Sequence, residues 1–234
     1  MHMFPKNALL IVQAGSHAYG TNTVDSDNDY RGIIPASRGM LVGLASWNDQ
    51  FETKDPDVVL YTLPKFIKLA LDANPNILDA LFSPDDCIIK STPTAQQLQK
   101  MAHLFLSKRV FHTFGGYAHH QLAKLRNPGG RHGAHQARIK KYGYDTKHAS
   151  HVVRLYRMGY EILTEGIVRV RRPDAKELLA IKHGAWNIAQ VEHFAAEMKD
   201  KMNDAYRHTA LPDEPDTDRI VSWLMTVQEM MLRR

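Results

Sequence analysis

The sequence lacks the cysteines that disulfide frameworks and thiolate metal sites require. Cys87 is the only cysteine among 234 residues, so no internal disulfide can form and a structural zinc site built from several thiolates is excluded. No run approaches the roughly 18 apolar residues that a membrane span needs, and the N-terminal stretch MHMFPKNALLIVQAGS has no signal-peptide cleavage pattern. We therefore expect a cytoplasmic protein without a membrane partner, whose metal ligands would be Asp, Glu or His.

Acidic residues are scarce in one region of the sequence. The net charge is +5, which permits a polyanionic partner without requiring one. Between Lys124 and His148, however, a single acid, Asp145, accompanies the basic residues Lys124, Arg126, Arg131, Arg138, Lys140, Lys141 and Lys147. Arg169, Arg171 and Arg172 form a second basic cluster. A solvated surface and a nucleic-acid contact both remain open for these clusters.

Hydrophobic patterning predicts a fold in two parts, an α/β or α+β head and a helical remainder, and we expect the α+β class. Short apolar runs at residues 8–14, 28–35 and 58–62 predict strands, and Thr62 with Pro64 predicts an N-cap and an early helical proline. From residue 94 onward the pattern predicts helices over 94–125, 146–165, 174–206 and 216–233. We therefore expect a head with a mixed sheet and flanking helices over residues 1–92, followed by a helical domain over 93–234 that closes over the site.

The stretch GSHAYGTNTVDSDNDYRG, residues 15–32, concentrates carboxylates after a small-residue turn. An EF-hand is excluded because Tyr30 and Ala36 stand where that loop needs Gly and Glu. A P-loop is excluded because Thr21 and Asn22 stand where Lys and Ser or Thr must follow the second glycine. If Asp27 and Asp29 enter a strand, their side chains lie on one face, because strand residues alternate.

Paired carboxylates of this kind suit hard divalent ions that also contact phosphates. Gly15 would let a phosphate approach the backbone closely, and Ser16 would add a hydroxyl and N–H donors. An Asx-turn loop is the alternative for Asp27 and Asp29, and Asp25 is interpreted as a turn or cap residue.

Three segments carry a resemblance to a known family: residues 15–32, DVVLYTLPKFIKLALDANPNILDALF and YDTKHASHVVRLYRMGYEILTEG. In this order they resemble the RNA-ligase-associated nucleotidyltransferases of phages and bacteria, within the DNA polymerase beta superfamily. The resemblance implies a third metal ligand, for which Asp57 is the best candidate and Asp55 or Glu52 the alternatives. It also implies two Mg²⁺ or Mn²⁺ ions and an NTP substrate. One ion, held by all three acids, would activate the acceptor hydroxyl, and the other, held by Asp27 and Asp29, would bind the triphosphate.

The helix predicted over 146–165 supplies a second candidate site. Lys147, His151 and Arg154 share one helical face, so this face could bind triphosphate oxygens or could be a solvated polar face. The resemblance favours nucleotide binding. Arg138, Lys140 and Lys141 are candidate nucleic-acid contacts, with Tyr142 and Tyr144 available for base stacking. His132 and His135 are interpreted as solvent or acceptor contacts and not as metal ligands.

The resulting hypothesis is transfer of an NMP to an acceptor hydroxyl, with an RNA or tRNA end as the acceptor and RNA ligase or repair proteins as partners. Nucleotidylation of a protein or small molecule is an alternative within the enzyme class, because the metal site does not select the acceptor. A catalytically idle nucleotide or nucleic-acid binding module is the alternative outside it. The retained Gly15, Ser16, Asp27 and Asp29 favour an enzyme.

Overall fold

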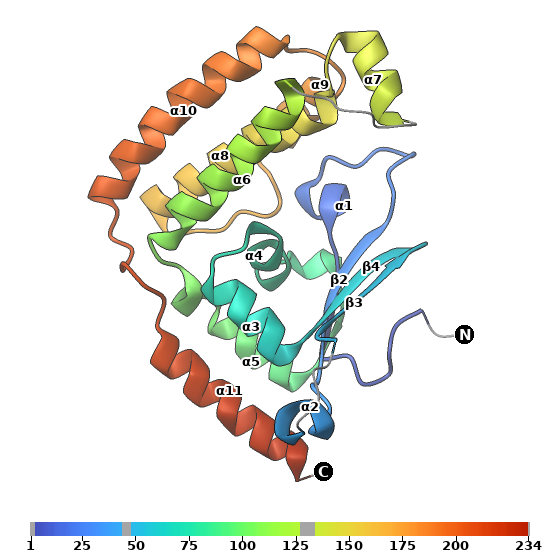
Figure 1. Ribbon diagram of the computed structural model, residues 1–234, viewed down its shortest axis with the longest axis vertical. Coiled ribbons are helices and arrows are strands. Elements are labelled where there is room, and N and C mark those ends of the chain that lie inside the picture. The colour runs from blue at the N-terminus through green and yellow to red at the C-terminus, as the bar shows by residue number, and fades with distance from the viewer. Residues whose placement is uncertain (1–2, 44–47, 127–133, 234) are drawn as a thin grey trace. The chain divides into compact units, whose positions relative to one another are not determined.

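The computed structural model describes residues 3–43, 48–126 and 134–233, and these residues form two compact units (Figure 1). Unit 1 contains Met1–Phe105 together with Glu214–Arg234, and unit 2 contains Leu106–Asp213. Residues 93–105 and 214–234 thus group with the sheet in terms of contacts, whereas the division expected from the sequence assigned them to the helical part. The domain boundary at residue 92 remains a prediction.

Unit 1 is built on a five-stranded mixed sheet in the order β3-β4-β2-β1-β5. Its strands are β1 (Leu10–Gln13), β2 (Asp29–Ile34), β3 (Gln50–Lys54), β4 (Asp57–Thr62) and β5 (Ile88–Ser91). The β2–β4 pair is parallel, and the other three pairs are antiparallel. With the helices described below, this sheet confirms the predicted α+β class.

Unit 1 also contains helices, some of which flank the sheet (Figure 1). They are α1 (Gly15–Tyr19), α2 (Arg38–Val42), α3 (Leu63–Leu71), α4 (Pro75–Leu81), α5 (Pro93–Lys100) and α11 (Thr217–Leu232), with 3-10 turns η1 (Asp85–Cys87) and η2 (Ala102–Phe105). The N-cap at Thr62 and the proline in the first turn of α3 are as predicted. Phe66 and Ile67 of α3 are fully buried, which fixes this helix on the core.

Unit 2 is helical and is organised around one central helix. It contains α6 (Arg109–Arg126), α7 (Ala134–Tyr142), α8 (Thr146–Glu165), α9 (Ala175–Lys182) and α10 (Ile188–His208). Helix α8, which has the predicted bounds, packs mainly against α6, α10 and α9. None of the helices in the described ranges combines the length and the apolar character that a membrane crossing requires.

Two of the predicted helices are divided in the structure. The expected helix over 94–125 separates into α5, η2 and α6, and the chain passes from unit 1 to unit 2 between η2 and α6. The expected helix over 174–206 separates into α9 and α10. Gly184 has a positive φ of 89° after α9, and the Asn187 side chain accepts a hydrogen bond from the Gln190 backbone N–H at the start of α10. A left-handed glycine ends a helix and Asn caps the next one.

Candidate active site

The parallel pairing of β2 and β4 brings two of the predicted acids together. Asp29 is the register partner of Asp57, at the start of both strands. Directly paired residues of neighbouring strands project to the same face of a sheet. The opposite face at this point carries Tyr30 and Val58, which belong to a hydrophobic cluster. The apolar face therefore fixes the register, and the register places both carboxylates on the other face.

Asp27 lies in the loop before β2, because the strand begins at Asp29. The expectation that both residues of the Asp-x-Asp pair lie on a strand is therefore wrong for Asp27, which is exposed. The loop is nevertheless held in place, since Gln13 at the end of β1 donates a hydrogen bond to the Asn28 side chain at 2.8 Å. An open pocket of about 510 Å³ is lined by Ser26, Asp27, Asn28, Asp29, Lys54, Asp55, Pro56 and Asp57.

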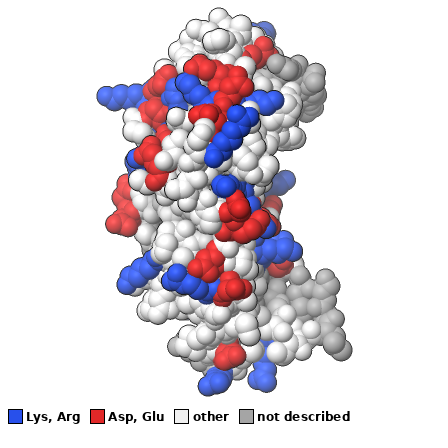
Figure 2. Space-filling view, turned by 90° about the vertical axis from the view of Figure 1, so that its left-hand side faces the viewer, with Lys and Arg blue, Asp and Glu red and all other residues white. Residues whose placement is uncertain are grey.

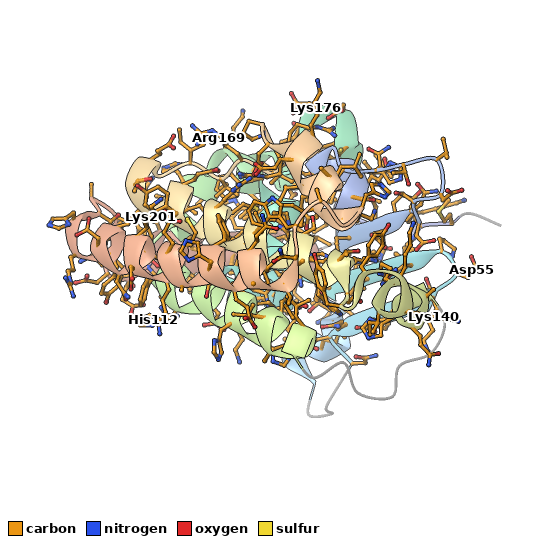
Figure 3. All side chains as sticks on the ribbon, turned by 90° about the horizontal axis from the view of Figure 1, so that it is seen from above. Asp55, His112, Lys140, Arg169, Lys176 and Lys201 are labelled. Carbon is orange, nitrogen blue, oxygen red and sulfur yellow. The ribbon has the colours of Figure 1, made fainter. Side chains whose placement is uncertain are left out.

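The three candidates for the third acid occupy different places. Asp57 pairs with Asp29, and its carboxylate lies 3.6 Å from the Arg31 guanidinium. Asp55 lines the pocket from the two-residue turn between β3 and β4, where Figure 3 labels its side chain. Glu52 lies within β3, where it pairs with Val59 of β4 and contacts the Gln50 side chain. This placement supports Asp57, and its assignment as a ligand remains a prediction.

The Gly-Ser segment contacts the acidic strand directly. Gly15 has a positive φ of 63°, and a Cβ placed on it would lie 2.1 Å from Asp29 Oδ2. The Ala14 N–H donates to the Asp29 carbonyl at 2.7 Å, which holds the two segments together. Instead of the tight turn expected after β1, Gly15 and Ser16 begin the short helix α1. This helix is anchored because the buried Tyr19 hydroxyl donates to Asp79 Oδ2 of α4 at 2.6 Å.

The predicted nucleotide-binding face of α8 is solvated only in part. Lys147 is exposed, but Arg154 is only 5% exposed and Met158, one turn further on, is fully buried. Arg154 Nη1 lies 3.2 Å from Met158 Sδ. A guanidinium is rarely buried to this extent unless it is paired. The burial of Arg154 argues against the simplest alternative, while nucleotide binding by this face remains a prediction.

His151 differs from the two cations of this face in its charge. Burial lowers the pKa of His151 to about 3, and the positive charges of Arg154, Lys147 and His148 act in the same direction. The imidazole is therefore neutral near pH 7. If this face binds a nucleotide, His151 would contribute a hydrogen bond and not a positive charge.

The predicted nucleic-acid residues lie on α7 and differ in their availability. Arg138 donates from Nε to Asp145 Oδ1 at 2.8 Å and from Nη2 to Asp145 Oδ2 at 3.2 Å. Lys140 and Lys141 are exposed, and Figure 3 labels Lys140 on this helix. Residues 127–133 of the basic segment, including Arg131 and His132, lie outside the described residues.

The two tyrosines proposed for base stacking are also differently placed. Tyr144 is buried and its hydroxyl donates to the Trp186 carbonyl, so it cannot present a ring to a base without rearrangement. Tyr142 is half-buried, with the Lys141 ammonium 4.9 Å from its ring centroid. The interpretation of Tyr144 as a stacking residue is therefore wrong, because its apolar ring fills the core of unit 2.

The second basic cluster is largely used within unit 2. Arg172 is 4% exposed and donates to both Glu161 carboxylate oxygens at 2.6 Å and to Asp174 Oδ1 at 2.8 Å. Arg169 pairs with Glu165. Figure 2 shows basic and acidic side chains interspersed over the face that it presents. These ion pairs indicate a structural role for Arg169 and Arg172.

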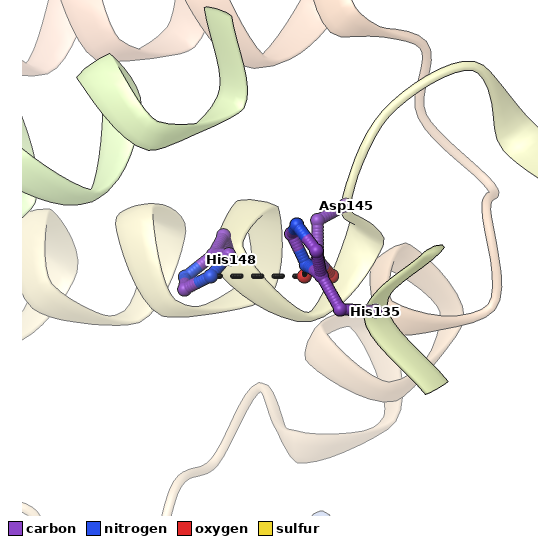
Figure 4. A group of neighbouring side chains, drawn as sticks. All are labelled: His135, Asp145 and His148. Carbon is purple, nitrogen blue, oxygen red and sulfur yellow. Dashed lines mark hydrogen bonds and ion pairs between the residues drawn. The ribbon is translucent and has the colours of Figure 1, made fainter. Parts of the chain in front are cut away.

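One cluster was not predicted from the sequence. His135 of α7, Asp145 before α8 and His148 of α8 converge, with one ligand atom from each within 4.8 Å of the others (Figure 4). Burial alone would raise the pKa of the Asp145 carboxyl, but hydrogen bonds from Arg138 and His135 and the positive charges of Arg138 and His148 hold it well below its usual range. The one available signal was that Asp145 is the single acid in a basic segment. The interpretation of His135 as a solvent contact is corrected by this cluster.

Two known proteins show similarity to this chain. A stretch of 87 residues is 39% identical to an uncharacterized 38.9 kDa protein from the nrdC-mobD intergenic region of Enterobacteria phage T4, covering 33% of this chain and 26% of the phage protein. The matched part is thus about a quarter of that relative. A nucleotidyltransferase-like protein from Exiguobacterium sibiricum aligns in structure over 86% of this chain and 69% of its own, with 12% identity and a TM-score of 0.31.

The family assignment rests on a match along nearly the whole chain. Residues 3–226 match the profile of RlaP, described as the RNA repair pathway DNA polymerase beta family. This range contains the pocket acids, the Gly-Ser segment and all of α8. The family resemblance inferred from the three sequence segments is thereby confirmed, and the chain belongs to the RNA repair pathway DNA polymerase beta family.

Proposed function

We propose that this protein is a metal-dependent nucleotidyltransferase that transfers an NMP from an NTP to an acceptor hydroxyl, with an RNA or tRNA end as the acceptor. The observation that carries the proposal is the pairing of Asp29 with Asp57 beside Gly15. It joins two carboxylates to the backbone segment that is proposed to bind phosphate, in a chain that belongs to a polymerase beta type family. RNA ligases or other repair proteins are the proposed partners.

The donor set of the pocket fits Mg²⁺ or Mn²⁺. Asp27, Asp29 and Asp57 offer only carboxylate oxygens, which these hard ions prefer. The space next to Gly15 that a Cβ would fill is occupied by the Asp29 carboxylate, so the acid and the Gly-Ser backbone share one surface. These three acids would hold two ions, which when bound supply charge neutralisation for the triphosphate and acidify the acceptor hydroxyl.

The chain's own groups would do the remaining work of binding and orientation. The Ser16 hydroxyl and the backbone beside Gly15 would bind phosphate oxygens. Arg31, which lies 3.6 Å from Asp57, balances the negative charge of the pocket and would help to hold that carboxylate in place. Lys147, His151 and Arg154 are proposed as triphosphate contacts, and Lys140 and Lys141 as contacts to the RNA backbone.

A transfer assay with labelled nucleotides tests this proposal. Each α-labelled NTP is incubated with Mg²⁺ or Mn²⁺ and with separate pools of RNA, tRNA, protein and small metabolites. We expect label in the RNA or tRNA pool and its loss in Asp29→Asn and Asp57→Asn, which remove a metal charge but preserve shape. Asp25→Asn is the matched control, because Asp25 is exposed in the same loop. Near-normal transfer by either test variant would overturn the site.

The same assay separates the remaining alternatives. Label in the protein or metabolite pool would replace the RNA acceptor with nucleotidylation of that class of acceptor. NTP binding by equilibrium dialysis, without transfer to any pool under any metal, would indicate an idle binding module. The acids would then hold a nucleotide without turning it over.

A further inference from the structure

We propose that His135, Asp145 and His148 form a site for a borderline transition metal such as Zn²⁺, separate from the acidic pocket. All three residues belong to unit 2, and Figure 4 shows their side chains facing one another. His135 Nδ1 contacts Asp145 Oδ2, and His148 Nε2 lies 3.6 Å from the same oxygen. The Asp145 carboxylate is 2% exposed, whereas both imidazoles are partly exposed. An ion could thus reach the site from the imidazole side.

The hydrogen bond on the far side of His148 determines which of its nitrogens faces the site. His148 Nδ1 lies 2.6 Å from the Gln121 carbonyl oxygen Oε1 of α6, which can only accept a hydrogen bond. Nδ1 must therefore carry the hydrogen. In the neutral ring Nε2 is then an acceptor, and it faces Asp145 Oδ2, which is also an acceptor. Either a proton on Nε2 or a metal ion between the two atoms satisfies both, and His135 Nδ1, in contact with the same oxygen, would supply the metal ion with a third ligand.

The carboxylate is oriented by groups that leave Oδ2 directed to the imidazoles. Arg138 Nε at 2.8 Å and the Lys147 backbone N–H at 2.9 Å both donate to Oδ1. A third donor, Arg138 Nη2, approaches Oδ2 at 3.2 Å. Hydrogen bonds that orient ligating carboxylates and histidines in this way are a regular part of metal sites. The site is therefore positioned by α6, α7 and α8 together.

The convergence of three ligand atoms is the geometric basis for a metal ion at this place. Ligands of a tetrahedral zinc ion lie about 3.3 Å apart, given a metal–ligand distance of about 2.0 Å. The His148–Asp145 separation of 3.6 Å therefore needs little change, whereas the His135 imidazole would move away from the carboxylate that it contacts. Arg138 neutralises part of the carboxylate charge, which disfavours Mg²⁺ and leaves the imidazoles as the main ligands. A fourth position would remain for water.

Zinc binding to the untagged, chelator-treated full chain tests the proposal. We expect isothermal titration calorimetry in the presence of excess Mg²⁺ to give one equivalent of bound Zn²⁺. Co²⁺ in place of Zn²⁺ should give the visible absorption of a tetrahedral ion. His135→Ala and His148→Ala should abolish both signals, and Gln121→Leu should weaken Zn²⁺ binding by roughly 10- to 100-fold because it frees the His148 tautomer. His193→Ala, an exposed histidine of α10, is the control.

Two results would overturn the proposal. One is the absence of stoichiometric Zn²⁺ binding by wild-type protein, or binding that survives in both histidine variants when circular dichroism shows them folded. The other is a histidine NMR titration in which His148 is an imidazolium at neutral pH whose signal Zn²⁺ does not perturb. In that case a proton, and not a metal, would lie between His148 and Asp145. Asp145→Asn is a poorer test, because it also removes the ion pair between Asp145 and Arg138.

Discussion

The contact between Gly15 and Asp29 allows the candidate site to be tested through the backbone. Replacing Gly15 with alanine adds one methyl group, which would lie 2.1 Å from Asp29 Oδ2, 3.1 Å from Cγ and 3.3 Å from Cβ. The nearest atom belongs to a side-chain carboxylate, so we expect that carboxylate to rotate away. The acid would then be displaced from the pocket without being removed.

The expected loss of stability has two parts. A left-handed backbone conformation costs an L-residue about 1–2 kcal/mol, and Gly15 has a φ of 63°. Driving Asp29 away from its preferred rotamer costs about 0.5–1.5 kcal/mol more. We therefore expect Gly15→Ala to lower the free energy of unfolding by about 1.5–3.5 kcal/mol. The rate of nucleotidyl transfer should fall further than the loss of stability alone would explain. A displacement of about 1 Å in a reacting group can reduce the rate by roughly 100-fold.

Gly166→Ala is the matched control. Gly166 has a similar φ of 68°, and a Cβ there would meet only Leu211 Cδ2 at 3.9 Å, an ordinary contact. It should lose the backbone contribution alone and keep full transfer activity. Urea unfolding followed by circular dichroism gives the stabilities, and the labelled-NTP assay gives the rates. Equal stability losses for the two variants, with transfer retained in Gly15→Ala, would refute the proposed role of this contact.

Three further predictions concern the charges of unit 2. Arg172→Ala removes the buried cation shared by Glu161 and Asp174, so we expect urea unfolding to show a loss of about 3–5 kcal/mol. Arg169→Ala, which breaks a surface pair with Glu165, should cost much less. Burial alone would raise the pKa of Asp174, but hydrogen bonds from Arg157 and Arg172 lower it overall. The ionised Asp174 carboxylate therefore contributes to stability above the unfolded pKa of about 3.9. This contribution is lost as the pH falls through the lower pKa of the folded state. The free-energy difference between wild type and Asp174→Asn should accordingly shrink below about pH 4, and a pH-independent difference would contradict the shift. Lys140→Ala with Lys141→Ala should flatten the log–log salt dependence of RNA binding by about 0.7 per lost phosphate contact, while Lys199→Ala with Lys201→Ala on α10 should not; an unchanged slope would identify α7 as a solvated surface.

Local sequence signals predicted the elements that carry the candidate acids. The apolar runs predicted β1, β2 and β4, and Thr62 predicted the start of α3. These predictions succeeded because each signal lies within the element that it predicts or directly next to it. The strands β3 and β5 were not predicted. Most of QFETK in β3 is exposed, and β5 has only four residues. Such edge strands are defined by pairing with distant segments, which a local pattern does not contain.

The candidate site was predictable as a set of residues but not as an arrangement. Asp27, Asp29 and Asp57 could be named from spacing and from the family resemblance, whereas the Asp29–Asp57 register depends on pairing across 28 positions of sequence. Tyr144 was misinterpreted because composition alone does not tell a buried ring from an exposed one. The His135–Asp145–His148 cluster depends on the packing of α7 against α8, so no fixed spacing indicated it.

The path of the chain between the two units has a consequence for synthesis. Unit 2 is an insertion, whose entry and exit are joined by hydrogen bonds from Lys108 N–H to the Pro212 carbonyl and, in unit 1, from Asp216 N–H to the Leu104 carbonyl. Translation therefore completes unit 2 before α11 exists, although α11 buries Ile220 and Val227 within unit 1. Unit 1, which carries the acids, is thus begun first and completed last. Ribosome-bound chains that end at residue 213 would thus contain every candidate ligand and still lack a completed unit 1 to hold them.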